Sequence, residues 1–345
     1  MSHIPDDKLF SHSERVRGKV VVITGAANGI GKETALRFAS YGAKVVIGDL
    51  DIAGATKVIA EIEKAGGSGL CIKCNVTKFE EQVELFELAM KKYGSVDVVI
   101  PNAGVSELGT FQSLQFKDGK PVKPTMATLE VNLIGVMYTA HLAVHYLQLH
   151  QKEGDLKSLI LIGSVASWLG IPKGEMYTAS KHAVLGVMRA LHPIMEVKGI
   201  RVGCIHPFFA DTAIVPLPVK LFLAGIPLTP VTRVAGAIFY AATDADMATS
   251  GSAWLLVDDG PVFMCPKEEF KMGVYKMIDD RANAGLAVLN GAKAWFAIFR
   301  DVWRITGQPI LLVGLTAGLA KVTWDNKQAI EGVVRDLLQT TIGLA

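Results

Sequence analysis

Three residues in the middle of the chain have the types and spacing of a proton-transfer site. Ser164 follows an apolar run, and Tyr177 and Lys181 lie four residues apart at the start of a predicted helix. An i, i+4 spacing places both side chains on one helix face. A tyrosine with a pKa of about 10 is a poor base at neutral pH, and a nearby ammonium group is expected to lower that pKa. Tyr177 is therefore predicted to exchange a proton with an alcohol or ketone, while Ser164 hydrogen-bonds the same oxygen.

A glycine-rich loop near the N-terminus supplies a second part of such a site. The β-branched run 19–24 leads directly into the loop, and a helix is predicted from about residue 30. Glycines permit a tight turn and a close backbone approach to a pyrophosphate, and the helix N-terminus attracts the anion. A strand before the loop and a helix after it are typical of dinucleotide binding. The residues predicted to bind here are Gly25, Asn28, Gly29, Ile30 and Gly31.

Asp49 is the candidate selector of the cofactor. It ends the predicted strand 44–49, twenty residues after Gly29. A carboxylate there can accept both ribose hydroxyl hydrogens of NAD and would repel the 2′-phosphate of NADP. Positions where a basic NADP anchor would stand are uncharged: Ala26, Ala27 and Leu50. The alternative is an aspartate that only begins a turn; the combined spacing favours NAD as the cofactor.

Short apolar strands alternate with helices along the chain and must position these residues. Strands are predicted over 19–24, 44–49, 69–74, 96–100, 158–163, 200–205 and 253–257. Helices are predicted over 30–41, 52–65, 79–93, 126–150 and 175–197. Such alternation demands right-handed crossovers and a parallel sheet. The predicted fold class is therefore α/β, a doubly wound parallel sheet (Rossmann fold) with a helical C-terminal extension.

Two long segments between these elements are predicted to be loops. Residues 107–125 contain Pro121 and Pro124, and residues 208–230 are apolar and rich in proline. Long loops beside an α/β sheet are often lids or binding loops. The apolar side chains of 208–230 favour a bulky hydrophobic substrate, so the expected partner is a lipophilic secondary alcohol or ketone.

Asn132 lies inside the apolar helix predicted over 126–150. Asparagine disfavours helix interiors because its side chain competes for backbone hydrogen bonds. Two interpretations stay open from the residue alone. It is an ordinary surface asparagine, or it has a role such as kinking the helix or holding a water for Lys181.

Composition excludes several other classes of protein. The 345 residues are 50% apolar and 20% charged, with a formal net charge of +2, which argues against nucleic-acid binding. Residues 1–19 are polar and lack the apolar region of a secretory signal, so a cytoplasmic protein is expected. Cys71 and Cys74 point to opposite faces of a predicted strand and are expected to be reduced core residues. His141 and His145 have no third ligand nearby, so no metal site is predicted.

Taken together, these motifs resemble the short-chain dehydrogenase/reductase family over about residues 17–265. The loop from Thr24 to Gly31 is similar to the family's cofactor loop, and Asn102-Ala103-Gly104 to its motif beside the adenosine ribose. The family's catalytic tetrad is matched one by one by Asn132, Ser164, Tyr177 and Lys181. The resemblance implies that Lys181 also holds the nicotinamide ribose and that Asn132 feeds a water-linked proton relay. It is strongest to NAD-dependent members acting on secondary alcohols of lipophilic molecules.

Several positions depart from the family pattern. Asn75-Val76 stands where many members have Asp-Val near the adenine, and an asparagine oxygen can still accept from the adenine amino group. Pro207-Phe208 replaces the usual Pro-Gly after the sixth strand. Thr212 still lies where the family contacts the carboxamide. Pro193, inside the predicted helix 175–197, is expected to kink it.

The chain is predicted to consist of an N-terminal arm (1–16), a NAD-binding and catalytic Rossmann domain (17–265) and a helical C-terminal extension (266–345). The extension carries an apolar stripe: Trp295, Phe296, Phe299, Val302 and Trp303. We expect it to pack on the core or on a partner subunit; the alternative is an interfacial anchor to a membrane or lipid droplet. Helices 126–150 and 175–197 are apolar around much of their circumference, which favours a homodimer or homotetramer.

The sequence therefore predicts an NAD-dependent oxidoreductase that interconverts a lipophilic secondary alcohol and its ketone. Two alternatives use the same fold. One is a non-catalytic dinucleotide-binding or scaffold protein, because fold alone does not fix function. The other is a family member recruited to a non-redox step, such as an isomerisation.

Overall fold

The computed structural model describes residues 2–270, apart from 211, 213, 214 and 216, together with isolated residues and short stretches between 276 and 332. The chain divides into two compact units, Met1–Gly273 and Val274–Ala345. Described residues of the second unit, such as Trp303, have mostly helical backbone. The rest of the predicted apolar stripe, Trp295, Phe296, Phe299 and Val302, lies outside the described residues.

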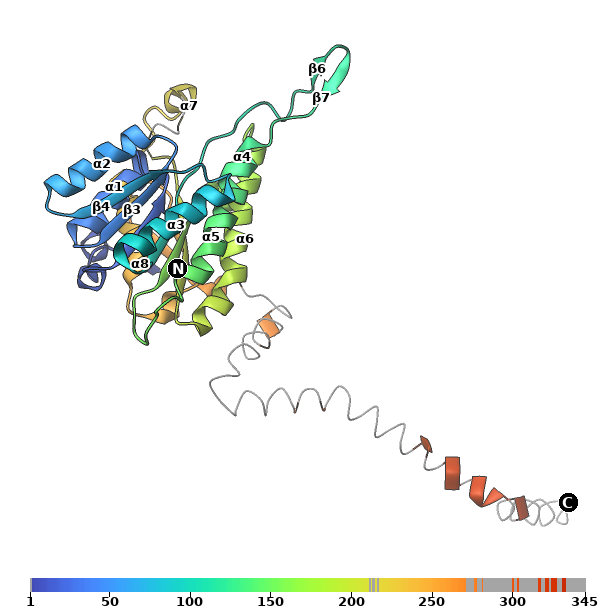
Figure 1. Ribbon diagram of the computed structural model, residues 1–345. Coiled ribbons are helices and arrows are strands. Elements are labelled where there is room, and N and C mark those ends of the chain that lie inside the picture. Colours follow the sequence, from blue (N-terminus) through green and yellow to red (C-terminus); the bar gives the residue numbers. More distant parts are fainter. Residues whose placement is uncertain are drawn as a thin grey trace. The chain divides into compact units, whose positions relative to one another are not determined.

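A single large sheet forms the centre of the first unit (Figure 1). Its parallel part runs in the order β10-β9-β8-β5-β2-β3-β4. The strands are β2 (Val20–Thr24), β3 (Lys44–Asp49), β4 (Ser68–Lys73), β5 (Val98–Pro101), β8 (Ser158–Ile162), β9 (Arg201–Pro207) and β10 (Ala253–Leu256). The predicted doubly wound α/β fold is confirmed, with every predicted strand present within about two residues of its expected ends.

Two strands at one edge of the sheet were not predicted. β11 (Val262–Cys265) pairs antiparallel with β10, and β1 (Ser2–Ile4) pairs antiparallel with β11. The segment 1–16 therefore contributes a strand to the sheet, and its Leu9 and Val16 are buried in the core. Phe10 stacks on Tyr41 at 5.5 Å between ring centroids.

Helices cover both faces of the sheet (Figure 1). One face packs against α1 (Gly29–Ser40), α2 (Ile52–Lys64) and α8 (Val231–Thr243). The other face packs against α3 (Phe79–Tyr93), α5 (Val136–Tyr146) and α6 (Glu175–Val197). α8 was not predicted.

The helix expected over 126–150 is not uniform. It consists of α4 (Ala127–Leu129), a π-helical segment (Glu130–Gly135) and α5, and it ends at Tyr146. Within the described part of the chain, this run is also the helix that is long and apolar enough to cross a membrane. A buried core helix can have the same length and composition, and the buried side chains of α5 belong to the core beside α3 and α6. One face of the run is therefore part of the core of the α/β unit.

Both predicted loops contain regular structure. Residues 107–125 include a hairpin of β6 (Gln115–Lys117) and β7 (Lys120–Val122), which projects from the body of the unit (Figure 1). Its turn residues Asp118 and Gly119 have φ values of 51° and 73°, which two-residue hairpin turns require. The loop 208–230 includes the short helix α7 (Leu217–Phe222).

The hairpin is expected to contribute little to stability, because all residues from 111 to 122 are exposed. Replacing residues 115–122 by two glycines should change the free energy of unfolding by less than about 1 kcal/mol. Urea denaturation measures this change. Ile23→Ala, in the fully buried β2, is the comparison and should cost about 2–5 kcal/mol. If the hairpin deletion lowered the free energy of unfolding as much as Ile23→Ala does, the expectation would be contradicted.

The topology defines where a ligand would bind. The chain passes from β2 outward to β3 and β4, then returns to the other side of β2 with β5 and β8. β2 and β5 are thus the neighbouring strands at which the winding direction changes. Ligands of doubly wound sheets bind at the carboxyl ends of such strands. The predicted loop at Gly25 and the motif at Asn102 both follow these two strands.

Candidate active site

The glycine loop between β2 and α1 is folded so tightly that side chains would not fit. A Cβ on Gly31 would lie 2.2 Å from the carbonyl oxygen of Gly25, and one on Gly25 would lie 2.6 Å from Ala103 Cα. Gly25 and Gly29 have φ values of 68° and 59°, a conformation that favours glycine. α1 begins at Gly29, with Asn28 as its N-cap. The loop thus brings bare backbone and a helix N-terminus together, as pyrophosphate binding requires.

Asn102 joins the end of β5 to this loop. Its Nδ2 donates to the carbonyl oxygens of Thr24 at 3.1 Å and Gly25 at 2.6 Å. The Ala103 N–H donates to Thr24 Oγ1 at 3.2 Å. The predicted motif Asn102-Ala103-Gly104 therefore lies directly beside the glycine loop.

Asp49 stands at the carboxyl end of β3 and also holds the loop. Its Oδ2 accepts from the Ala27 N–H at 2.8 Å, and its Oδ1 accepts from the Asp51 N–H at 2.9 Å. Each oxygen keeps a further lone pair for a ribose hydroxyl. Leu50, one of the positions where a basic NADP anchor would stand, is 60% exposed and adds no charge.

Asn75 lies beyond β4, and its side chain forms a local turn. Its Oδ1 accepts from the Thr77 N–H at 3.0 Å and from Thr77 Oγ1 at 2.9 Å. These two bonds use both lone pairs of the amide oxygen. The expected acceptance from an adenine amino group would require this turn to open. Val76 is buried beside the π-helical segment, within contact distance of Gly135.

Ser164, Tyr177 and Lys181 converge at the carboxyl end of β8. Ser164 caps the short 3-10 helix Val165–Ser167, its Oγ accepting from the Ala166 N–H at 3.1 Å, and its hydroxyl is near enough to the Tyr177 phenol to act on its pKa. Lys181 lies one turn after Tyr177 on α6, with Nζ 5.7 Å from the centroid of the tyrosine ring. The same Nζ donates to the Ile162 carbonyl oxygen at 2.9 Å. The helix spacing therefore produces the shared face that was predicted.

The pKa values of this group differ from expectation. Burial raises the pKa of Tyr177, and the hydrogen bond from Ser164 opposes this rise. Burial lowers the pKa of Lys181 to about 8. The expectation that Lys181 lowers the pKa of Tyr177 is therefore wrong for the protein alone. The reason is that desolvation acts on both groups, disfavouring the phenolate and the ammonium alike.

Asn132 is fully buried at the centre of the π-helical segment. Its Oδ1 accepts from the Val105 N–H, and its Nδ2 donates to the Val105 carbonyl oxygen, both at 2.8 Å. Nδ2 also lies 3.4 Å from Ser180 Oγ on α6. The surface interpretation of Asn132 is thus wrong. π-Helical turns often occur at functional sites, and here one places an amide between the cofactor motif and α6.

The segment after β9 borders the same edge of the sheet. Pro207 ends β9, and Thr212 lies opposite Gly29, with its Cγ2 3.4 Å from the position of an added Cβ there. His206 is buried, and its Nδ1 lies 3.1 Å from the Ser164 carbonyl oxygen. Burial lowers the pKa of His206 to about 3, so it is a neutral packing residue beside Ser164.

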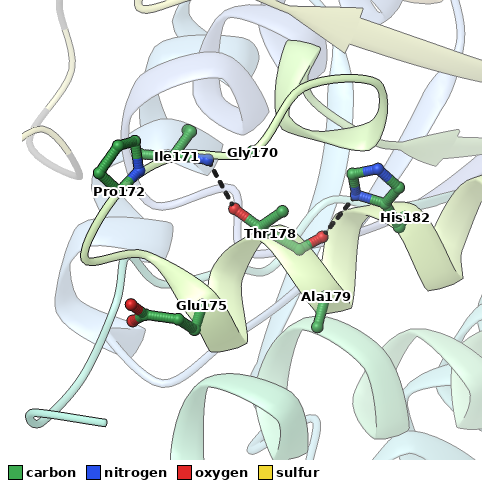
Figure 2. Close-up of a pocket in the computed structure, with 7 residues that line it drawn as sticks. All are labelled: Gly170, Ile171, Pro172, Glu175, Thr178, Ala179 and His182. Carbon is green, nitrogen blue, oxygen red and sulfur yellow. Dashed lines mark hydrogen bonds between the residues drawn. The ribbon is translucent and has the colours of Figure 1, made fainter. Parts of the chain in front are cut away.

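A shallow cavity of about 630 Å³ lies beside the first turn of α6 but contains none of the three central residues (Figure 2). Thr178 Oγ1 accepts from the Ile171 N–H at 3.2 Å, and the Thr178 carbonyl oxygen lies 3.0 Å from His182 Nδ1. The lining residues are Gly170, Ile171, Pro172, Glu175, Thr178, Ala179 and His182. Tyr177 lies between two of these residues in sequence, so the cavity marks the outer surface of the turn that carries it.

The cysteines and histidines show no sign of a metal site. All four cysteines are free, with Cys71 half-buried in β4 and Cys74 buried just after it. His141 and His145 are exposed on α5. Over the residues that the structure describes, no group of His, Cys, Asp and Glu is arranged to hold a metal ion.

One side chain close to the centre was missed by sequence reasoning. The Glu107 carboxylate accepts from the backbone N–H of Tyr177 at 2.7 Å and from that of Met176 at 3.4 Å. Glu107 is separated from Tyr177 by 70 positions in the chain and follows no recognised motif, so no local pattern could have identified it.

Comparison with known proteins agrees with this geometry. A family model described as short chain dehydrogenase matches residues 19–217. The chain belongs to this family. As a short-chain dehydrogenase it is an oxidoreductase, and the expected resemblance is confirmed.

Curated relatives cover most of the first unit. The 3-oxoacyl-[acyl-carrier-protein] reductase of Thermotoga maritima is 31% identical over 72% of this short-chain dehydrogenase and 99% of its own length. A cyclohexanol dehydrogenase from Acinetobacter sp. is 32% identical over 59% of this chain and 77% of its own. Among solved structures, a 7α-hydroxysteroid dehydrogenase complexed with NADH and 7-oxo glycochenodeoxycholic acid is 27% identical, with a TM-score of 0.63, covering 72% of this chain and 97% of its own.

Proposed function

We propose that this short-chain dehydrogenase transfers a hydride between NAD and a lipophilic secondary alcohol or its ketone, with Tyr177 as the general acid–base. The observation that carries the proposal is that Lys181 Nζ lies 5.7 Å from the centroid of the Tyr177 ring, one helical turn away, while Ser164 acts on the Tyr177 phenol from the end of β8. A scaffold protein has no need of this arrangement beside a dinucleotide loop.

The residues of the site divide the binding and the proton transfer between them. The tight loop at Gly25–Gly31, the Asn102–Gly104 motif and Asp49 fit a dinucleotide, because a Cβ would fill the cradle. When bound, the dinucleotide accepts or supplies the hydride. Tyr177 takes the hydroxyl proton during oxidation and returns it during reduction. Ser164 donates to the substrate oxygen as negative charge develops on it.

Lys181 supports this chemistry by its charge and its donors. Its ammonium already donates to the Ile162 carbonyl oxygen, and two further N–H groups remain to hold ribose hydroxyls. Filling these donors stabilises the charged form of Lys181 and raises its pKa from about 8. A fully charged Lys181 then favours the Tyr177 phenolate, which burial alone disfavours. Asn132 and Ser180 connect α6 to the cofactor motif; their part in a water relay remains a prediction.

The choice of NAD over NADP rests on Asp49. Asp49→Asn keeps an acceptor for the Ala27 N–H but removes the charge that would repel a 2′-phosphate. Because a hydrogen bond to a charged group is worth about 1.5–3 kcal/mol, the ratio of kcat/KM for NAD to that for NADP should fall about 10- to 100-fold. Initial rates with each cofactor measure this ratio.

Asp51→Asn is the matched control for that experiment. It removes the same charge two residues away, where the carboxylate caps α2 through the Gly54 N–H. Its selectivity should stay close to that of the wild type. Equal effects of the two substitutions, or a wild-type preference for NADP, would contradict the assignment of Asp49.

The substrate proposal rests on apolar side chains near the carboxyl edge of the sheet. Leu221 is 69% exposed and Ile226 45% exposed, both in the segment after β9, and Trp168 follows the 3-10 helix that Ser164 caps. A relative acts on cyclohexanol by its name, and a structural neighbour holds a bile-acid ketone. A panel of cyclic and steroid secondary alcohols, assayed for cofactor reduction with NAD and NADP, tests the proposal. No turnover with any member, despite dinucleotide binding, would favour the scaffold or non-redox alternatives.

Assembly as a homodimer or homotetramer is part of the same proposal. Exposed apolar side chains lie along α6 and the helical run that ends in α5: Ile134, Met137, Ile194 and Val197. Such a face is expected to be covered by a second subunit.

A cytoplasmic location also remains a prediction, consistent with four unpaired cysteines.

A further inference from the structure

The first turn of α6 carries Tyr177 but has no local capping group. α6 begins at Glu175, and its N-cap residue is Gly174, which has no side chain to accept from the free N–H groups. The first turn of a helix frays readily unless such groups are satisfied. Tyr177 is the third residue of this helix, so its position depends directly on how that turn is held.

Glu107 supplies the missing cap from a distant part of the chain. Its Oε2 accepts from the Tyr177 N–H at 2.7 Å, and its Oε1 lies 3.4 Å from the Met176 nitrogen. A carboxylate is favoured here twice, because it accepts from backbone donors and because it faces the positive end of the helix dipole. Glu107 is half-buried, which limits competition from water for these bonds.

The segment that carries Glu107 is also bonded to the other parts of the site. We call residues 102–108 the strap. At its start, Asn102 bonds the glycine loop. At its middle, both backbone groups of Val105 pair with the Asn132 amide. At its end, the Leu108 N–H donates to Thr128 Oγ1 at 2.9 Å, and that hydroxyl donates to the Ser106 carbonyl oxygen at 3.2 Å.

We propose that Glu107 is a positioning residue that fixes the first turn of α6 to the strap, and so sets where Tyr177 stands relative to the cofactor loop. The strap joins the glycine loop, the π-helical segment and α6 through seven consecutive residues. Of the hydrogen bonds made by the strap, the one accepted by Glu107 comes directly from the backbone N–H of Tyr177. Proton transfer requires hydrogen-bond reach, and a displacement of about 1 Å can cost about 10²-fold in rate.

The role of Glu107 in turnover rests on the proposed function, whereas its hold on α6 does not. Glu107→Ala removes the acceptor and should lower kcat about 10- to 100-fold, with KM for the alcohol and Kd for NADH changed by less than about threefold. Glu107→Gln keeps a neutral acceptor oxygen and should recover most of kcat. Recovery by glutamine separates positioning from a general loss of folding.

Glu175→Ala is the matched control. Glu175 is an acidic residue in the same helical turn, but its carboxylate accepts from the Gln112 side chain and not from Tyr177. This variant should keep kcat within about threefold of the wild type. The unfolding temperature of every variant is measured alongside, and rates are taken well below it.

Hydrogen exchange of the peptide covering 175–181 provides a readout independent of activity. Glu107→Ala should raise exchange in this turn at least tenfold, while Glu107→Gln and Glu175→Ala leave it close to wild type. Unchanged exchange in Glu107→Ala, or equal losses of kcat in Glu107→Ala and Glu175→Ala, would overturn the proposal. If the wild-type protein turns over no substrate, the proposed function fails, and the exchange result alone decides whether Glu107 holds the turn.

Discussion

Replacing Tyr177 by phenylalanine is expected to lower kcat about 10²- to 10⁴-fold, while the affinity for NADH stays within about threefold of the wild type. The substitution removes one hydroxyl, which is the group proposed to exchange the proton with substrate. The ring itself remains, and Lys181 keeps its bond to the Ile162 carbonyl oxygen, so the donors proposed for the cofactor are unchanged. Steady-state rates and the quenching or enhancement of NADH fluorescence measure the two quantities separately.

The pH dependence of the wild type gives a second signature of Tyr177. Alcohol oxidation needs the phenolate, so its rate should rise with pH toward the pKa of Tyr177. Ketone reduction needs the neutral phenol, so its rate should fall above the same pKa. Because burial raises that pKa in the protein alone, both changes in rate are expected on the alkaline side of neutrality. Both the rise of the oxidation rate and the fall of the reduction rate with pH should disappear in Tyr177→Phe.

Tyr146→Phe is the control for the loss of a hydroxyl. Tyr146 ends α5, is half-buried, and packs on Phe86 at 5.0 Å between ring centroids. This tyrosine lies outside the proposed site, and its replacement should leave kcat within about twofold of the wild type. Retention of turnover within tenfold in Tyr177→Phe would remove the proposed acid–base role.

The strands and most helices could be predicted because local sequence encodes them strongly. β2 is a run of β-branched residues that is buried on both faces, as expected for a central parallel strand. α3 begins and ends where its acidic first turn and Gly94 indicate. Tyr177 and Lys181 share a helix face for the same local reason, so their juxtaposition followed from spacing alone.

Three of the features that were missed depend on contacts between distant segments. β1 is a three-residue strand in a polar region, and it exists because β11 offers an unpaired edge. The π-helical turn at Asn132 arises where the amide pairs with Val105, 27 residues earlier in the chain. Glu107 caps a helix that begins far beyond it in sequence. Such contacts have no periodic signal, so only the folded chain reveals them.

The pKa of Tyr177 could not be inferred from spacing for a different reason. A lysine one turn away was expected to lower it, but the balance depends on how much water each group loses. Lys181 is buried beside a carbonyl oxygen and is itself pushed toward neutrality. Burial is a property of the whole fold, so the sign of the shift required the three-dimensional arrangement.

At the amino ends of the central strands, away from the site, replacing Asp97 by alanine is expected to lower the free energy of unfolding by about 3–5 kcal/mol. Asp97 and Lys157 form an ion pair at 2.9 Å, with side chains that are 5% and 2% exposed. The Asp97 carboxylate also accepts from the Val20 N–H at 2.7 Å, and Lys157 Nζ donates to the Val96 carbonyl oxygen at 2.8 Å. The pair thus links the amino ends of β2, β5 and β8. Asp97→Ala leaves the lysine buried without its partner, and urea denaturation measures the loss.

The double variant Asp97→Ala/Lys157→Met distinguishes the pair from its separate residues. Removing both charges relieves the unpaired lysine, so the double variant should be more stable than the sum of the two single losses predicts. Asp155→Ala is the more accessible comparison, since both side chains of its pair with Lys19 are 28% exposed, and this pair should contribute less than about 1 kcal/mol. Strictly additive losses, or a cost for Asp97→Ala no larger than that for Asp155→Ala, would contradict the expectation.

β2, β5 and β8 carry the glycine loop, the strap and Ser164 at their other ends. Turnover per folded molecule should therefore be preserved, which separates the residues that hold the sheet together from those that perform the chemistry.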